Sequence, residues 1–580
     1  MKQPVLETQI DFNGHQQLVP EKWKSDSPDL VADQNQAILL SHRKIIRRWN
    51  RLSRLQRSIF SALFLIIAAS VILFYSSKVN TTDLYKNGDS NIIMEPLKNV
   101  SLVNEPIAND GQLKKAAEGD PNERPIFTGP SNARQYAVVE SFKHAWKSYK
   151  EHAWGHDNLK PLSGMAFDWF SLGLTIVDGL DTAYIMGLTE EFEEGKQWVK
   201  NELIFTKSKD VNFFEVTIRV LGALLTNYHF TQDEMFLNKA KDLGDRLMAA
   251  FSSPSGIPYS DVNLGTKTAH APEWSHYSTT AEVTTVQLEF RELSRATNDP
   301  VYEDAAAAVS EKIHQLPKKH GLVPIFINPN TGQFLPHATI TLGARGDSYY
   351  EYLLKQWLQT GKTINYLLDD YMTAIEGVRE FLAMRSSPNK HLFIGELSAG
   401  SESFNPKMDH LTCFLPGTLA LGHANDLPDW HMTMAEELLY TCYLTYAVHP
   451  TFLAPEITHF NMASATNDMY TKTADAHNLL RPEFVESLWY MYQITGNTTY
   501  QEWGWQIFQS LEKYAKVPNG YTSLANVKSD KPLQRDMMES FFLSETLKYL
   551  YLLFSEDRFM IDLNKYVINS EAHPLPIHKN

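Results

Sequence analysis

The chain has 580 residues, of which 43% are hydrophobic and 12% aromatic, and its formal net charge is −15. This length exceeds the usual size of a single core, so we expect several domains or one large repetitive architecture. The acidic balance argues against a nucleic-acid-binding surface and is compatible with an acidic cleft.

The N-terminal part contains one apolar segment, residues 58–77, with the sequence SIFSALFLIIAASVILFYSS. Its 20 uncharged residues are enough to cross a bilayer as a helix. Seven Lys or Arg lie between Arg43 and Arg57, and such charge keeps the preceding end in the cytosol. A cleaved signal peptide is the alternative, but the segment lies deep in the chain and lacks a clear small-x-small cleavage site. We therefore predict a single-pass type II protein with a cytosolic tail at 1–57, a signal anchor at 58–77 and a lumenal remainder.

Residues 78–125 are polar, rich in turn formers and poor in aromatics, which predicts a flexible lumenal stem. Residues 126–580 then form one dense stretch without another obvious linker, and we expect a single domain there. N-glycosylation sequons beyond the predicted anchor are Asn80, Asn99 and Asn497.

The chain has two cysteines, Cys413 and Cys442. In an oxidising lumen they would pair, whereas two buried free thiols are the alternative.

From residue 126 onward the periodicity is helical nearly throughout, and several apolar segments open with an ionisable residue. Examples are FEVTIRVLGALLTNYHF from residue 214 and PEFVESLWYMYQITGN from residue 482. Several are followed by a more amphipathic helix, so the repeated unit is a helical hairpin. We call the ionisable residue that opens each segment its head. The heads are Glu215, Glu282, Asp347, His410, Glu483 and Glu539, and successive heads are 67, 65, 63, 73 and 56 residues apart.

An earlier segment, LGLTIVDGLDTAYIMGL at 172–188, offers Asp178 and Asp181 as heads of a seventh unit. Apolar inner helices wrapped by amphipathic outer ones form either an open solenoid or a closed α/α toroid. A toroid whose inner helices all start at one end would gather the acids at one mouth of a central cavity, whereas a solenoid would spread them along a ridge.

One acid in the first turn of a helix is explained by capping and by the helix dipole. A second acid, a turn further along an apolar segment, is not, because a buried carboxylate is costly unless it is paired or used. Such second acids are Glu351, Glu486 and Glu545. Arginines within four residues of a head acid could pair with it or bind hydroxyls, and they are Arg219, Arg345 and Arg481.

A cavity lined by carboxylates, arginines, histidine and aromatic rings suits a polyhydroxylated substrate. Glycoside hydrolysis requires two carboxyl groups, and a surplus of acids favours a hard cation such as Ca²⁺. No HExxH, His-rich or CxxC pattern predicts zinc, and no P-loop or Rossmann fingerprint predicts a nucleotide.

These motifs resemble those of the class I α-1,2-mannosidases, glycoside hydrolase family 47. The resemblance covers essentially all of residues 126–577 and rests on LGLTIVDGLDTAYIMGL, FEVTIRVLGALL, IPYSDVNLGT, RGDSYYEYLLKQW, HNLLRPEFVESLWYMYQITGN, ESFFLSETLKYLYLLFS and NSEAHPLPI. It implies an all-α fold, an (α/α)7 barrel plugged by a C-terminal hairpin. The implied reaction is the inverting removal of terminal α-1,2-linked mannose from high-mannose N-glycans.

The resemblance also implies site residues. Glu215 matches the family's general acid, and Asp347 and Glu483 match the other two catalytic carboxylates. Glu483 is the preferred base that activates the attacking water, although it stays open which of Asp347 and Glu483 has this role. Positions matching the residues that line the sugar site are Arg219, Glu282, Arg345, His410, Arg481 and Phe541.

In this family a Ca²⁺ at the barrel base is bound by a Thr in an NTEAHP motif, and Ser570 stands at that position here. Serine keeps the hydroxyl but lacks the methyl that stiffens χ1, so we expect calcium to be bound more weakly. Carboxylates matching those that hold calcium-bound waters are Glu486, Glu545 and Glu571. Cys413 and Cys442 match the family's disulfide.

Arg345 favours the endoplasmic reticulum type of the family, which removes a single mannose in glycoprotein maturation and quality control, because Golgi members tend to have an apolar residue there. A Golgi trimming enzyme is the nearest alternative. A lectin-like degradation factor is the second, although such relatives depart from the pattern at the cysteine pair; a lyase or epimerase on an α/α toroid is the third. The expected partners are high-mannose N-glycans and a membrane, with no nucleic acid, and we expect a monomer.

Overall fold

The computed structural model describes residues 9–10, 16–17, 125–398, 403–463 and 465–578. The chain divides into two compact units, Met1–Ile107 and Ala108–Asn580. In the first unit, strand β1 (Gln9–Ile10) pairs antiparallel with β2 (Gln16–Gln17).

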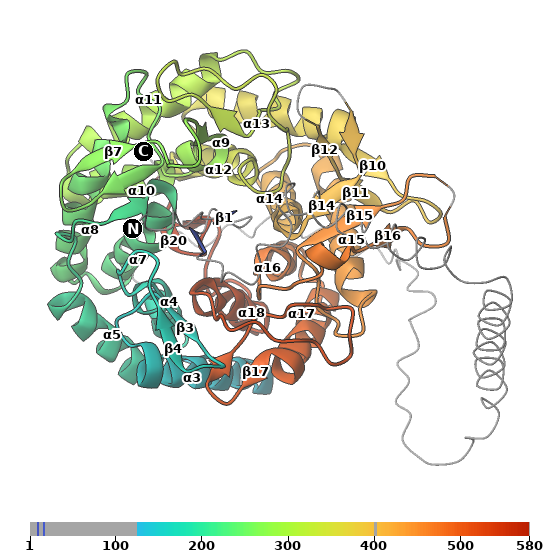
Figure 1. The fold of residues 1–580 in the computed structure, drawn as a ribbon, viewed down its shortest axis with the longest axis horizontal. Helices are drawn as coiled ribbons and strands as arrows, with labels where there is room; N and C mark the ends of the chain where they lie inside the picture. The colour runs from blue at the N-terminus through green and yellow to red at the C-terminus, as the bar shows by residue number, and fades with distance from the viewer. Residues whose placement is uncertain (1–8, 11–15, 18–124, 399–402, 464, 579–580) are drawn as a thin grey trace, which may run out of the picture. The chain divides into compact units, whose positions relative to one another are not determined.

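Within the described part of this second unit, seven helical hairpins close into a ring of inner helices surrounded by outer helices (Figure 1). The inner helices are α4 (Leu174–Ile185), α7 (Gly222–Thr231), α10 (Gln287–Thr297), α12 (Asp347–Gln359), α14 (Leu415–His423), α16 (Glu483–Thr495) and α18 (Leu547–Leu553). The outer helices are α3 (Ala133–Ala153), α5 (Thr189–Asn201), α8 (Glu234–Leu247), α11 (Val301–Gln315), α13 (Asn365–Gly377), α15 (Trp430–Ala447) and α17 (Thr499–Ser510).

The ring is closed by contact between its first and last members. Helix α18 packs against α3, and the turn that precedes α18 packs against α4, so the cyan and red ends of the coloured ribbon meet in Figure 1. The structure is therefore the closed toroid and not the open solenoid.

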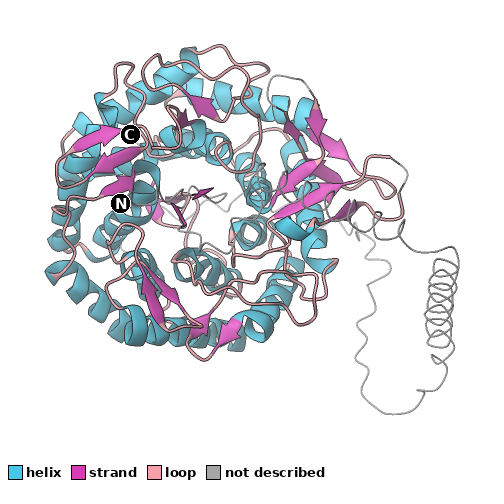
Figure 2. Cartoon of the chain, viewed as in Figure 1, coloured by secondary structure: helices cyan, strands magenta, loops and turns pink. Residues whose placement is uncertain are grey.

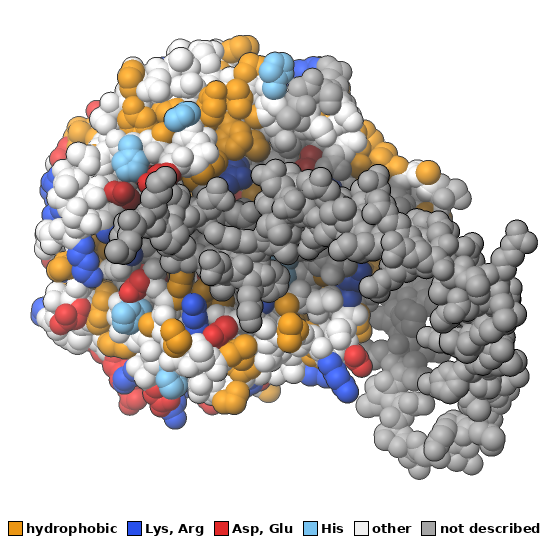
Figure 3. Space-filling view, in the orientation of Figure 1, with side chains coloured by type: hydrophobic (Ala, Val, Ile, Leu, Met, Phe, Trp, Pro, Cys, Tyr) orange, Lys and Arg blue, Asp and Glu red, His pale blue; other side chains and the backbone are white. Residues whose placement is uncertain are grey.

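Burial separates the two rings as the sequence pattern predicts. In inner helix α12 every residue from Ser348 to Gln359 is buried. In outer helix α5 the buried residues are Phe192, Gly195 and Val199, a spacing that forms one stripe. A helix that is enclosed on all sides lies in the core, whereas one apolar stripe is typical of a helix at the surface. On the face seen in Figure 3, acidic and basic side chains are interspersed over the described surface.

Several inner helices are preceded by a short, separate helical turn that carries a predicted site residue. Two are α-helical, α6 (Phe213–Val216) and α9 (Thr280–Val283), and η5 (His410–Phe414) is a 3₁₀ turn. Two are π-helical, η2 (Thr217–Leu221) before α7 and η8 (Phe542–Thr546) before α18. π-Turns inside helices are frequent at functional sites, because they re-aim side chains within an otherwise regular helix.

Many connections contain short strands, which lie between and around the helices in Figure 2. The pairs are β3 (Asn158–Lys160) with β4 (Met165–Phe167), β8 (Ser278–Thr279) with β9 (Phe326–Ile327), β10 (Ala383–Arg385) with β11 (Leu392–Ile394), β12 (Glu396–Leu397) with β13 (Phe404–Asn405), and β17 (Lys516–Val517) with β18 (Gly520–Tyr521). Three-stranded sheets are β5 (Asp210–Asn212), β6 (Asp261–Asn263) and β7 (Thr268–His270), and β14 (Lys407–Asp409), β15 (Ile457–Phe460) and β16 (Met469–Tyr470). Strands this short do not show a period of two in sequence, which is why the all-α prediction does not mention them.

The C-terminal segment forms an antiparallel hairpin of β19 (Tyr566–Ile568) and β20 (Pro574–Pro576). It contacts the inner helices α7, α10 and α12. A Cβ at Gly222 of α7 would lie 2.6 Å from Asn569 Nδ2, so only glycine allows the hairpin tip to come this close. The hairpin thus occupies the space inside the inner ring, as expected of a plug.

Among the described residues, none of the helices is both long and apolar enough to cross a membrane. The predicted anchor at 58–77 and nearly all of the predicted tail and stem lie outside these residues, as do Asn80 and Asn99. Those divisions of the chain stay predictions. Asn497 is described and lies partly exposed between α16 and α17.

Candidate active site

The first turns of the inner helices meet at one end of the barrel. His410 at the start of η5 contacts Glu483 at the start of α16. Arg345, just before α12, accepts a backbone hydrogen bond from Ala281 in α9. Arg219 in η2 donates to Ser540, which precedes η8. The common mouth predicted from the repeat is therefore present for these segments.

Glu215 is held by a cap and by an arginine. Strand β5 ends at Asn212, whose side chain accepts a hydrogen bond from the Glu215 backbone N–H at 2.9 Å and so starts the helix there. Arg219 Nε donates to Glu215 Oε2 at 2.8 Å, and its Nη1 forms an ion pair with Glu571 of the hairpin tip. Since only 8% of Glu215 and of Arg219 is exposed, this guanidinium links the predicted acid to the plug in a largely dry environment.

Glu483 sits between a histidine and an arginine. His410 Nδ1 lies 2.6 Å from Glu483 Oε2, and Arg481 Nη1 lies 3.7 Å from Glu483 Oε1. Burial by itself would raise the pKa of Glu483, but the hydrogen bond and charge of His410, together with Arg481, outweigh it and lower the pKa. Tyr446 contacts the other ring nitrogen of His410 at 2.6 Å and fixes the ring orientation. Glu483 is thus an ionised carboxylate at neutral pH.

Asp347 has the opposite character. Its carboxylate accepts a hydrogen bond from the Ser348 N–H at 2.9 Å. Burial nevertheless raises the pKa of Asp347 to about 7, and the negative charge of Glu351 and Glu483 adds to the rise. The pKa values of these two neighbouring carboxyl groups are therefore pushed in opposite directions by their surroundings.

Glu282 and Arg345 lie on the neighbouring side of the mouth. Burial raises the pKa of Glu282 to about 7, although the charge of Arg345 opposes the rise. Arg345 adopts a left-handed backbone with φ of 73°, a strained conformation for a residue with a Cβ. Its guanidinium stacks over Trp274 at 4.9 Å and lies 5.8 Å from the Phe326 ring.

Phe541 lies between two of the predicted arginines. The guanidinium carbons of Arg219 and Arg481 are 5.8 and 5.9 Å from its ring centre. Arg481 is held in turn by Glu456, whose Oε2 accepts from its Nε at 2.7 Å. The aromatic face and the two cations form one wall of the mouth.

Ser570 lies at the tip of the hairpin, inside the ring. Its hydroxyl donates to Glu351 Oε2 at 3.3 Å, and its N–H donates to the Tyr352 hydroxyl at 3.2 Å. Lys355 Nζ lies 2.5 Å from Glu351 and 3.8 Å from Glu486. Burial and the charges of Glu571, Glu486 and Glu483 hold the pKa of Glu545 well above its usual range. The plug therefore delivers one hydroxyl into a crowded group of buried carboxylates.

The rest of the tip is fixed by ion pairs. His573 Nε2 lies 3.2 Å from Asp178, and its Nδ1 lies 3.2 Å from Asp181. Lys548 Nζ donates to Asp181 at 2.7 Å and to the Ala572 carbonyl at 2.6 Å. The predicted seventh unit is present, but Asp178 and Asp181 lie well inside α4 and do not open it. Both acids contact the plug, and Asp178 also lies 3.6 Å from Arg219 Nη1.

The two cysteines form a disulfide between Cys413 in η5 and Cys442 in α15, with their Cα atoms 6.0 Å apart. It ties an inner turn to its outer helix directly beyond His410. The alternative of two free thiols is thereby removed.

Comparison with known proteins decides the family. The family model for glycosyl hydrolase family 47 matches residues 141–577, a range that contains all the groups described above. The chain belongs to glycosyl hydrolase family 47.

Members of this family are found among curated proteins and solved structures. The chain is 56% identical to the endoplasmic reticulum mannosyl-oligosaccharide 1,2-alpha-mannosidases of Homo sapiens and Rattus norvegicus, over 77% of its own length. The match spans 64% of the human protein and 69% of the rat protein. A solved alpha-1,2-mannosidase from Trichoderma reesei is 26% identical, with a TM-score of 0.72, covering 78% of this chain and all of that one.

Some residues of this family 47 site were missed by the predicted site set. Glu351 contacts Ser570 directly, and its place one turn after Asp347 was the available signal. Lys355 and Lys548 were missed because a single lysine in an apolar helix forms no motif that would indicate a functional site. Among the described residues, no group of three or more His, Cys, Asp or Glu side chains is arranged to hold a metal ion.

Proposed function

We propose that the chain is an inverting exo-α-1,2-mannosidase that removes terminal α-1,2-linked mannose from high-mannose N-glycans. The observation that carries the proposal is the pair of contacts that keeps Glu483 ionised, His410 at 2.6 Å and Arg481 at 3.7 Å, in the same mouth as Glu215. An inverting glycosidase needs a carboxylate to activate water and a second carboxyl group to protonate the leaving oxygen. The names of the curated relatives support the choice of mannose and of the α-1,2 linkage.

In the proposed mechanism, Glu215 protonates the glycosidic oxygen through a water molecule while Arg219 holds its carboxylate in place. Glu483 accepts the proton of the attacking water, because its lowered pKa keeps it unprotonated at neutral pH. Asp347, with a pKa of about 7, is the second candidate for that role. Arg345, Arg481, Phe541 and Glu282 bind the hydroxyls and the apolar face of the sugar.

We propose Ca²⁺ as the cofactor, and the residues present fit it. A hard cation prefers several oxygen ligands, and the tip presents the Ser570 hydroxyl among buried carboxylates. Burial and the charges of neighbouring carboxylates hold the pKa of Glu545 and of Glu571 well above the usual range. Ser570 would contact the ion directly, and Glu486, Glu545 and Glu571 would hold its waters. When bound, calcium would supply a Lewis acid for the hydroxyls of the mannose being cleaved.

We also propose residence in the endoplasmic reticulum as a type II membrane protein anchored by residues 58–77. Arg345 and the names of the mammalian relatives support this compartment. A Golgi enzyme is the second candidate, because a short anchor followed by a stem is equally compatible with Golgi residence.

The test is to incubate the lumenal part, residues 78–580, with a nine-mannose glycan in calcium and, separately, in a chelator, and to identify the product isomers. We expect one eight-mannose isomer in calcium and no product in the chelator. Absence of trimming in calcium would contradict the enzyme proposal. Rapid conversion to a five-mannose product would favour the Golgi alternative.

A further inference from the structure

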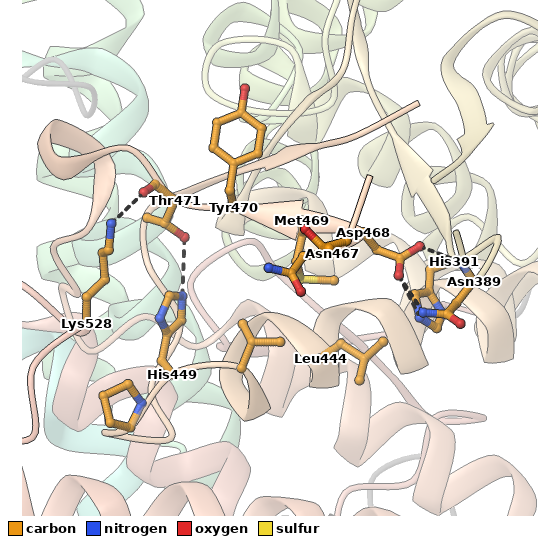
Figure 4. Close-up of a pocket in the computed structure, with 13 residues that line it drawn as sticks. Asn389, His391, Leu444, His449, Asn467, Asp468, Met469, Tyr470, Thr471 and Lys528 are labelled. Carbon is orange, nitrogen blue, oxygen red and sulfur yellow. Dashed lines mark hydrogen bonds and ion pairs between the residues drawn. The ribbon is translucent and has the colours of Figure 1, made fainter. Parts of the chain in front are cut away.

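A pocket lies away from the acid cluster, beside the outer helix α15. It has a volume of about 600 Å³ and is bounded by the end of α15, by strand β16 and by the residues before β11 (Figure 4). We call it the side pocket and define it by Asn389, His391, Leu444, His449, Asp468 and Lys528. Its volume falls in the range of sites that bind small molecules.

The side pocket has polar groups at its two ends and an apolar floor. At one end Asp468 accepts hydrogen bonds from the Asn389 side chain at 2.7 Å and from the Ser386 hydroxyl at 2.6 Å. At the other end His449 contacts the Thr471 hydroxyl at 3.2 Å. Leu444 projects from α15 between them, as Figure 4 shows. A ligand that fits must be amphiphilic, with hydroxyls at its edges and an apolar face.

The charge of the side pocket excludes several ligand classes. Of the described residues that line it, one carries a carboxylate, Asp468, and one an ammonium, Lys528. Burial lowers the pKa of His449 to about 4 and also lowers the pKa of His391, so both rings are neutral at pH 7. A phosphate or nucleotide would need more positive charge, because such anions are bound by several cations or N–H donors. A neutral polyhydroxylated ligand matches a lining with one negative and one positive charge.

Aromatic rings stand exposed beside the side pocket. Tyr470 is 48% exposed and stacks on His459 at 5.3 Å, and Tyr440 is 44% exposed and lies against His391 at 5.8 Å. Large aromatic side chains at a surface are typical of binding sites, because they offer an apolar face together with a polar edge.

The side pocket is joined to the active site by one small sheet. Tyr470 of β16 pairs with His459 of β15, and β15 pairs with β14. Strand β14 ends at Asp409, and the next residue, His410, contacts the proposed base Glu483. Because adjacent strands are about 4.8 Å apart, the sheet spans only about 10 Å between the wall of the side pocket and the strand that leads into the mouth.

We propose that the side pocket binds a second mannosyl arm of the branched glycan whose terminal mannose is cleaved at the mouth. A branched glycan is long enough to occupy both places at once, and the added contact favours large glycans over short ones by raising the effective concentration of the cleavable arm. This inference rests on the proposed function, because it takes the glycan as the substrate.

The test compares two substitutions, Val448→Trp, which fills the side pocket, and Tyr470→Ala, which removes its exposed ring. Val301→Trp in α11 is the matched control, since Val301 is 45% exposed and Val448 is 54% exposed. Each protein is assayed on a nine-mannose glycan and on the disaccharide α-1,2-mannobiose, which is too short to reach both places. We expect both pocket variants to raise KM for the large glycan about tenfold with kcat unchanged, and to leave both constants for mannobiose unchanged. Tenfold corresponds to about 1.4 kcal/mol.

An unchanged KM for the large glycan, or an equal change for mannobiose, would overturn the side pocket proposal while leaving the proposed function intact. If the parent protein cleaves neither substrate, the proposed function fails. Equilibrium binding of the nine-mannose glycan then tests whether the side pocket binds glycan. In that case a Kd equal in the parent and in Val448→Trp would overturn it, and a Kd about tenfold weaker in the variant would support it. A third assay uses an intact high-mannose glycoprotein, and a KM effect seen only with that substrate would assign the side pocket to polypeptide and would also overturn the proposal.

Discussion

At the scale of single residues, the chemistry of the mouth depends on how burial and neighbouring charges act on similar carboxyl groups. His410 and Arg481 lower the pKa of Glu483, whereas burial and the negative charges of Glu351 and Glu483 raise the pKa of Asp347 to about 7. The sequence names these acids but does not order their pKa values, because His410 lies 73 residues from Glu483 in the chain.

Replacing Glu483 by Gln tests the assignment of the base. The change keeps the shape but removes the proton acceptor, so we expect turnover to fall by about 10²- to 10⁴-fold with glycan binding retained. Steady-state kinetics and a glycan-binding titration measure the two effects. Glu437→Gln, at an exposed pair with Arg385, is the control and should leave turnover unchanged. Retained turnover in Glu483→Gln would give the role to Asp347.

Replacing Ser570 by Thr tests the proposed calcium ligand. The added methyl restricts χ1 and so reduces the entropy lost when the hydroxyl binds the ion. We expect the calcium Kd to fall by a factor of about two to five, an estimate for one restricted rotor. Calorimetric titration of calcium into the chelator-treated protein measures it. An equal or weaker affinity would show that the missing methyl is unimportant.

At the scale of elements, the β19–β20 hairpin is the part whose placement creates the site. Its tip is held by two Asp from α4, by Lys548 of α18, and by a carboxyl group of α10. That carboxyl group, Glu289, has one oxygen bound to the Tyr352 hydroxyl and the Asn569 amide, each at 2.8 Å, while its other oxygen is buried without a hydrogen bond. An unsatisfied buried oxygen disfavours the ionised form.

Glu289 should therefore make stability fall with rising pH. Burial raises its folded-state pKa to about 7, above the ordinary value of 4.5. The contribution of Glu289 to the free energy of unfolding is complete below pH 4.5 and is lost as pH rises through 7. The full loss is about 3 kcal/mol, because a pKa change of one unit corresponds to about 1.4 kcal/mol. In saturating calcium, Glu289→Gln should match the parent's thermal midpoint at pH 5 and exceed it at pH 8. A difference independent of pH would contradict this account.

The Cys413–Cys442 disulfide acts on the α14–α15 hairpin. The bridge closes a loop between cysteines 29 residues apart in sequence, and restricting the unfolded chain over such a loop is worth about 3–4 kcal/mol. We expect the double substitution of both cysteines by Ala to lower the thermal midpoint by several degrees. Replacement of the exposed Met165 by Ala is the control. A midpoint unchanged by the double substitution would mean that packing alone holds the hairpin.

At the scale of the whole molecule, the barrel brings together acids from distant hairpins, so a cation bound among them should stabilise the entire ring. Calcium at 100 times its Kd would raise the free energy of unfolding by about 2.7 kcal/mol. Differential scanning calorimetry across a calcium series should show a rising midpoint, and magnesium at equal ionic strength should not replace it, because that ion demands stricter geometry. A midpoint independent of calcium would contradict the proposed cofactor.

The sequence by itself determined the helical hairpin repeat, the family and the acids that begin α12 and α16. These features are local: they depend on a 3.6-residue period, on caps such as Asn212 before Glu215, and on long continuous motifs. It also predicted that the C-terminal hairpin plugs the barrel, and this hairpin contacts the inner helices α7, α10 and α12.

Only the tertiary structure decided which acids face the mouth and which anchor the plug. Asp178 and Asp181 read like head acids in the sequence, yet closure of the ring places them against His573 and Lys548, which lie more than 360 residues away. Closure likewise sets the lowered pKa of Glu483 and brings Glu351 to Ser570. Such effects depend on distances in space, which a periodic pattern along the chain does not contain.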